Sequence, residues 1–139
     1  MLRITADSNE YISALNFGGK PQQILELARA GKIELAISNA IITELQRILF
    51  NKFRWSKPDV DDAVEQILAF AQYVRPDMKF DAVPTDPDDN RVLECAAKAK
   101  SDLIVTGDMD LLALEFHHGA RILTPAGFMA DWQGQRRQP

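Results

Sequence analysis

The segment LRITADSNEYIS, residues 2–13, decides the fold class. Its apolar beginning, residues 2–6, predicts a short buried strand that stops at Asp7, just where a helix begins. Two interpretations of Asp7 remain open at this point. Its side chain caps the following helix, or it presents an oxygen ligand at the carboxyl end of a parallel strand, where open α/β sheets bind their ligands.

The same order of strand and helix recurs along the rest of the chain. Further strands are expected over 33–37, 102–108 and 120–125. Helices are expected over 10–15, 21–30, 38–53, 58–74, 88–100, 108–115 and 126–132. This alternation implies a mostly parallel sheet with helices on both faces. We therefore expect a single three-layer α/β/α domain over residues 1–132, with four or five central strands, followed by a polar, disordered tail at 133–139.

The composition is that of an ordinary soluble domain. Of 139 residues, 46% are hydrophobic and 26% are charged, and no apolar run approaches the ~20 residues that cross a bilayer. The N-terminus lacks the basic and apolar regions of a signal peptide, and Cys95 is the single cysteine, so we expect a cytoplasmic protein. The net charge of −4 argues against binding nucleic acid through a mainly basic surface.

Acidic residues mark one edge of the predicted sheet. Asp7 and Asp108 each follow an apolar strand, so their carboxylates converge if these strands are neighbours. Asp89 shares a helix face with buried positions, and Glu44 lies at the margin of an apolar stripe. Each acid also has a purely structural interpretation. Asp108 caps the next helix, Asp89 follows an Asp86 cap, and Glu44 is an ordinary flanking residue.

The combination of these acids favours a metal site. Two carboxylates ~4 Å apart repel by about 4 kcal/mol at an effective dielectric constant near 20. Four converging carboxylates therefore need protons or a cation to neutralise them. Oxygen ligands without thiolates or clustered imidazoles suit Mg²⁺ or Mn²⁺.

Four segments resemble the PIN domain family, and more narrowly its bacterial VapC-like toxins of toxin–antitoxin systems. They are ITADSNEYIS (4–13), ISNAIITELQRIL (37–49), DPDDNRVLECA (86–96) and LIVTGDMDLL (103–112). The resemblance extends over residues 2–125, in the family's order. It implies a Rossmann-like nuclease domain that hydrolyses phosphodiester bonds in single-stranded RNA.

The resemblance also assigns the site residues and partners. It places the family's catalytic and metal-binding acids at Asp7, Glu44, Asp89 and Asp108. Auxiliary positions fall at Asn9, Thr106 and Asp110, although Asn9 and Thr106 are equally typical of turns. It implies one or two Mg²⁺ or Mn²⁺ ions, an RNA substrate, a cognate antitoxin, a homodimer and no association with membranes.

Two alternatives stay open. The chain is a PIN-fold binding module without catalysis, or a phosphatase similar to the haloacid dehalogenases, whose late acidic motif resembles TGDMD (106–110). Those phosphatases need a second aspartate two residues after the first, and this chain has Asn9 there. That substitution counts strongly against the phosphatase.

Overall fold

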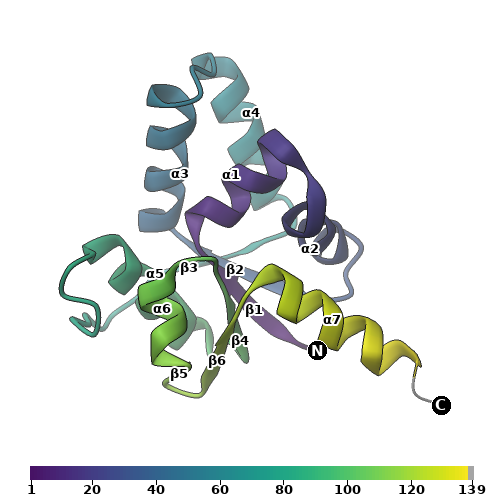
Figure 1. The fold of residues 1–139 in the computed structure, drawn as a ribbon. Coiled ribbons are helices and arrows are strands. Elements are labelled where there is room, and N and C mark those ends of the chain that lie inside the picture. Colours follow the sequence, from purple (N-terminus) through teal and green to yellow (C-terminus); the bar gives the residue numbers. More distant parts are fainter. Residues whose placement is uncertain (138–139) are drawn as a thin grey trace.

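A mostly parallel sheet runs through the centre of the molecule (Figure 1). The computed structural model describes the backbone of residues 1–137 and the side chains up to residue 134. Within this part, six strands lie in the order β3-β2-β1-β4-β6-β5. They are β1 (Arg3–Ala6), β2 (Glu34–Ser38), β3 (Gln72–Val74), β4 (Leu103–Val105), β5 (Phe116–His117) and β6 (Ala120–Leu123). β5 is antiparallel to β6, and the other neighbouring pairs are parallel.

The expected fold class is confirmed, but the sheet has six strands instead of four or five. β3 lies in the segment that we expected to be the end of a helix over 58–74. That helix instead ends at Leu68, and Tyr73 pairs with Ile37 of β2. β3 has three residues and β5 has two, which is too short for an alternating pattern to stand out in the sequence.

Helices cover both faces of the sheet (Figure 1). They are α1 (Ser8–Phe17), α2 (Gly19–Arg29), α3 (Asn39–Asn51), α4 (Lys57–Leu68), α5 (Pro87–Ala99), α6 (Met109–Leu114) and α7 (Pro125–Arg137). α5 packs against β1, β2 and β3, while α1, α2 and α7 lie on the other side. α7 includes residues 133–137 of the segment that we expected to be a tail, and residues 138–139 lie outside the described part.

The core forms between the two helical layers and the sheet. Ile4, Ile37 and Ile104 come from three adjacent strands, and each is fully buried. Leu93 of α5 and Leu45 of α3 are buried in the same cluster. Burying one such side chain contributes about 2–3 kcal/mol, so these contacts fix the strand order. Among residues 1–137, no helix has the length and apolar character that crossing a membrane requires.

The strand order creates a crevice beside β1. The chain passes from β1 to β2 and β3 on one side, and later places β4 on the other side of β1. Ligands of open α/β sheets bind at the carboxyl ends of strands where the order reverses in this way. The paired ends are Ala6 of β1 and Val105 of β4, so the residues that follow them share the crevice.

Candidate functional site

Asp7 lies in the crevice and also caps a helix. Its carboxylate Oδ1 accepts a hydrogen bond from the backbone N–H of Glu10 at 3.1 Å, which fixes the start of α1. The Thr106 hydroxyl donates to the other oxygen, Oδ2. Only 4% of Asp7 is exposed. The two interpretations of Asp7 are thus compatible, because capping leaves the second oxygen facing the neighbouring strand end.

Thr106 connects the ends of the two strands. Its hydroxyl donates to Asp7 and accepts the backbone N–H of Asp108 at 3.0 Å. Asp108 in turn caps α6, since its Oδ1 accepts from the backbone N–H groups of Asp110 and Leu111 at 2.9 and 3.1 Å. Because Thr106 is fully buried, it acts as a rigid link between the two carboxylates.

Asp89 approaches the same place from the first turn of α5. It is 6% exposed, and its Oδ2 has no hydrogen-bond partner among the described residues. Burial and the adjacent Asp108 carboxyl raise the pKa of Asp89 well above its usual value. A buried carboxylate oxygen without a partner is costly, so this side chain needs a proton or a cation.

Three carboxylates gather closely at this point. One oxygen from each of Asp86, Asp89 and Asp108 lies within 4.8 Å of the others. These oxygens are the donors that Mg²⁺ and Mn²⁺ prefer, and the unpartnered oxygen of Asp89 is the kind of group that a cation satisfies. The residues present therefore fit a hard divalent ion.

Asp7 and Glu44 lie beside this group. Burial raises the pKa of Asp7 to about 6, although its bonds from Thr106 and Glu10 oppose the shift, and the charges of Asp108 and Glu44 add to it. Burial also raises the pKa of Glu44, against a hydrogen bond from the Ser8 hydroxyl. The four predicted acids thus face one crevice, with Asp89 and Asp108 closest together.

The auxiliary positions divide into two kinds. Thr106 lies inside the site, as described above. Asn9 and Asp110 are exposed in the first turns of α1 and α6, outside the group of three carboxylates. Their placement leaves their role in binding a substrate as a prediction.

Two acids of the crevice escaped the sequence reasoning. Asp86 was considered only as a helix cap, yet its carboxylate joins Asp89 and Asp108. Glu10 lies near Asp7 and the backbone of Gly107. Burial and the Asp7 charge raise the pKa of Glu10 to about 7, against a hydrogen bond from the Gly107 backbone. The only signal for Glu10 in the sequence is its position three residues after the cap Asp7, where a capping box places an acid.

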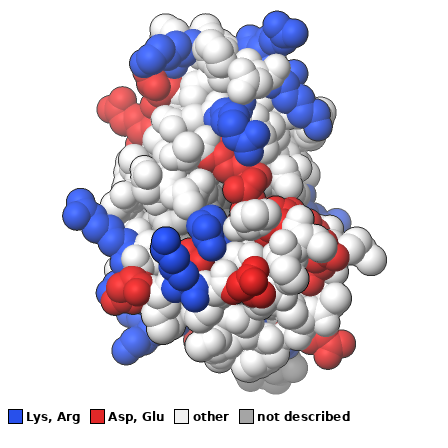
Figure 2. All heavy atoms as spheres, turned by 90° about the vertical axis from the view of Figure 1, so that its left-hand side faces the viewer, with Lys and Arg blue, Asp and Glu red and all other residues white. Residues whose placement is uncertain are grey.

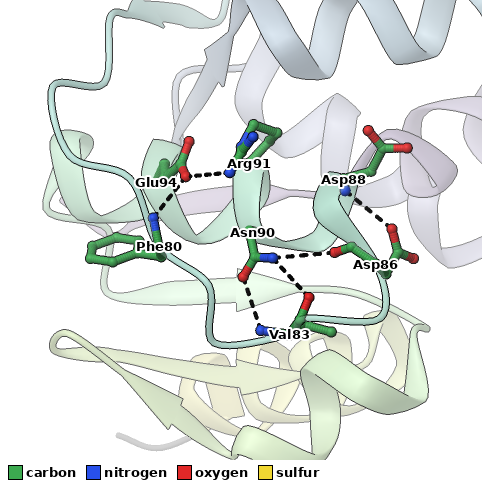
Figure 3. A network of polar contacts seen from close by, with 7 residues as sticks. All are labelled: Phe80, Val83, Asp86, Asp88, Asn90, Arg91 and Glu94. Carbon is green, nitrogen blue, oxygen red and sulfur yellow. Dashed lines mark hydrogen bonds and ion pairs between the residues drawn. The ribbon is translucent and has the colours of Figure 1, made fainter.

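The loop that carries Asp86 is fastened to α5 (Figure 3). The buried side chain of Asn90 accepts from the backbone N–H of Val83 at 2.9 Å and donates to the Val83 carbonyl at 2.8 Å. Further along the helix, Glu94 accepts from the backbone N–H of Phe80 at 2.9 Å and pairs with Arg91 at 2.8 Å. These bonds hold the loop, and with it Asp86, against the helix that carries Asp89.

Replacing Asn90 with alanine is expected to loosen this loop and destabilise the protein by about 2–4 kcal/mol. The change leaves the buried N–H and carbonyl groups of Val83 without partners, and each such loss costs about 1–3 kcal/mol. Urea unfolding measures the difference. The matched control, Asn51→Ala, removes an exposed amide and should change stability by less than about 0.5 kcal/mol. Equal effects of the two variants would contradict this role of Asn90.

The face around the crevice carries both signs of charge (Figure 2). Acidic side chains occupy its hollow centre, and Lys and Arg side chains surround them. Two arginines lie near the acids, since Arg47 is 3.7 Å from Asp88 and Arg91 pairs with Glu94. The net charge of −4 therefore conceals a local arrangement of cations around an acidic centre.

A pocket adjoins this face at the carboxyl ends of β2 and β3. Tyr73, Arg75 and Arg91 line it together with the first residues of α3. The guanidinium of Arg75 lies over the Tyr73 ring, 5.9 Å from its centroid. Cations beside an exposed aromatic ring can bind a phosphate and stack a base.

Comparisons with known proteins agree on one family. The family model described as PIN domain matches residues 3–110. No curated protein matches the sequence. Solved structures with a similar fold include VapBC2 from Rickettsia felis bound to a promoter DNA fragment, which has a TM-score of 0.64 at 15% identity and coverage of 88% of this chain and 98% of that one.

Two further structures have the same fold. PAE2754 from Pyrobaculum aerophilum has a TM-score of 0.65 at 14% identity, with 96% of this chain and 91% of that chain covered. The RRP44 PIN domain from T. brucei has a TM-score of 0.57 at 10% identity, with 97% and 83% covered. At these identities the likeness concerns the fold.

Proposed function

Because the chain belongs to the PIN domain family, we propose that it is a metal-dependent endoribonuclease that hydrolyses phosphodiester bonds of single-stranded RNA. The observation that carries the proposal is the convergence of carboxylates on Asp89, a buried side chain with an unpartnered oxygen, at the crevice of the sheet. Nucleases of this family generally use divalent ions, and such an acidic cluster is what these ions require.

In this proposal Asp7, Glu44, Asp89 and Asp108 hold one or two Mg²⁺ or Mn²⁺ ions. When bound, such an ion lowers the pKa of a water molecule and neutralises charge on the phosphate. The chain's own residues position these groups. Thr106 orients Asp7, and Ser8 orients Glu44 toward the crevice. Asn9 and Asp110 are placed at its exposed rim, where they contact the RNA.

RNA approaches over the face of mixed charge. The arginines near the crevice attract the phosphates, while the acidic centre stays occupied by metal. The pocket of Tyr73, Arg75 and Arg91 suits a nucleotide beside the cleaved bond, because it offers both a ring and two cations. Splayed bases of this kind are available in single-stranded RNA and not within a duplex.

The test is cleavage of end-labelled RNA by the purified chain. Single-stranded RNA should be cut with Mg²⁺ or Mn²⁺, and chelation by EDTA should stop the reaction. Duplex RNA of the same sequence should remain intact. Metal binding without cleavage of any single-stranded RNA would favour the alternative of a PIN-fold binding module. The phosphatase alternative gains nothing, since the family is different and position 9 is asparagine.

The biological role that we propose is the toxin of a toxin–antitoxin pair acting in the cytoplasm. The support is the resemblance to VapC-like toxins and the fold shared with VapBC2. A cognate antitoxin should co-purify with the chain and inhibit cleavage. The homodimer is part of the same proposal, and light scattering of the purified chain should give twice its mass of 15.6 kDa.

A further inference from the structure

Asp86 stands apart from the acids that the family resemblance assigns. Its carboxylate is nevertheless one of the three whose oxygens lie within 4.8 Å of one another, together with Asp89 and Asp108. Asp7 and Glu44 do not belong to this close group. The five carboxylates of the crevice are therefore distributed over two neighbouring places, with Asp89 and Asp108 between them.

The position of Asp86 is fixed by the fold. Its Oδ1 accepts the backbone N–H of Asp88 at 3.1 Å and caps α5. The side-chain amide of Asn90 lies 3.5 Å from the Asp86 carbonyl and binds both backbone groups of Val83 (Figure 3). Capping uses one oxygen, which leaves the other available to a ligand.

An independent observation points to a ligand at this place. Asp89 is 6% exposed, and its Oδ2 has no hydrogen-bond partner in the part of the chain described. Buried polar atoms are nearly always paired, so an orphaned carboxylate oxygen amid two other carboxylates calls for a positive partner. Asp86 is the additional acid that surrounds this oxygen.

We propose that Asp86 completes a second divalent-cation position with Asp89 and Asp108, beside the position that includes Asp7; this inference rests on the metal-dependent function proposed above. One divalent ion neutralises two of the five charges in the crevice, and two ions neutralise four. Oxygens on opposite sides of Mg²⁺ are about 4 Å apart, since each bond is about 2 Å. The three oxygens therefore need only small movements to share an ion.

The experiment measures metal binding directly. Metal-free protein at pH 7.5 is titrated with MnCl₂ in a calorimeter, for the wild type, Asp86→Asn and Asp88→Asn. The wild type should bind two Mn²⁺ ions per chain. Asp86→Asn should bind one, or bind the second at least about 10-fold more weakly. Asparagine caps helices as well as aspartate does, so this variant should keep its circular dichroism spectrum and melting temperature.

The matched control is Asp88→Asn, which removes the same charge from an exposed neighbour outside the close group. It should bind two ions like the wild type. Asp86→Asn with wild-type stoichiometry and affinity would overturn the proposal, and so would a wild type that binds a single ion. Two bound ions that depend on Asp86, without any RNA cleavage, would instead refute the nuclease function and leave the second position standing.

Discussion

Asp7→Asn is expected to lower metal-dependent cleavage of single-stranded RNA by at least about 100-fold. The carboxylate lies at the end of β1, adjacent to the charges of Asp108 and Glu44, and the amide that replaces it is a weaker ligand without charge. Rates of cleavage under single-turnover conditions, at saturating Mn²⁺, measure the effect without a contribution from product release.

The same variant should fold as well as the wild type, or better. An asparagine oxygen still accepts the backbone N–H of Glu10, so the cap of α1 is retained. The substitution also removes a buried charge from a group of carboxylates. The melting temperature in EDTA at pH 8 should therefore be equal to or above that of the wild type, which separates loss of catalysis from loss of structure.

The control for this prediction is Asp59→Asn. Asp59 is an exposed acid in the first turn of α4, so it matches Asp7 in charge and in helix position but lies outside the crevice. Its cleavage rate should stay within about twofold of the wild type. Unchanged cleavage by Asp7→Asn would remove Asp7 from the mechanism.

The sequence was sufficient for the fold class because each long element carries its own pattern. The apolar strands that end at Asp7 and before Asp108 are recognisable without any knowledge of their neighbours, and helix alternation then requires a parallel sheet. β3 was missed for the opposite reason. Its three residues become a strand only because β2 offers an edge to pair with, which is a tertiary effect.

The candidate site was predictable to a similar extent. Strand ends place Asp7 and Asp108 together through topology alone. The segment DPDD contains three aspartates, and local pattern does not tell which of them faces the crevice. Asp88 points toward Arg47, whereas Asp86 joins Asp89, because Asn90 fixes the loop before the helix. Such a distinction depends on contacts between residues whose positions only the fold determines.

The metal-free protein is expected to lose stability as the pH rises from about 5 to 8, and divalent ions should restore it. The pKa of Asp7 is raised from 3.8 to about 6, and that of Asp89 is raised as well. Groups with a raised pKa hold protons in the folded state that the unfolded chain releases. Their stabilising contribution is therefore complete below pH 4 and is lost as the pH rises through the folded-state pKa.

The shift of Asp7 alone corresponds to about 3 kcal/mol over the whole window. Mg²⁺ or Mn²⁺ binds the folded form and replaces the lost protons, and an ion at 100 times its dissociation constant adds about 2.7 kcal/mol. For a chain of this length, 1 kcal/mol changes the melting temperature by about 3–4 °C. The rise on adding 5 mM MnCl₂ in place of EDTA should thus be about 8 °C or more at pH 8, and small at pH 5.

Thermal unfolding followed by circular dichroism at pH 5, 6, 7 and 8, with MnCl₂ or with EDTA, measures both effects. The variant Asp7→Asn serves as the control, because it lacks one of the groups that titrate. In EDTA its melting temperature should vary less with pH than that of the wild type. If the metal-free wild type were equally stable across this range, or if Mn²⁺ stabilised it equally at pH 5 and pH 8, the carboxylates of the crevice would not be competing for protons and metal. The clustering of Asp7, Asp89 and Asp108 would then have to be explained without a cation.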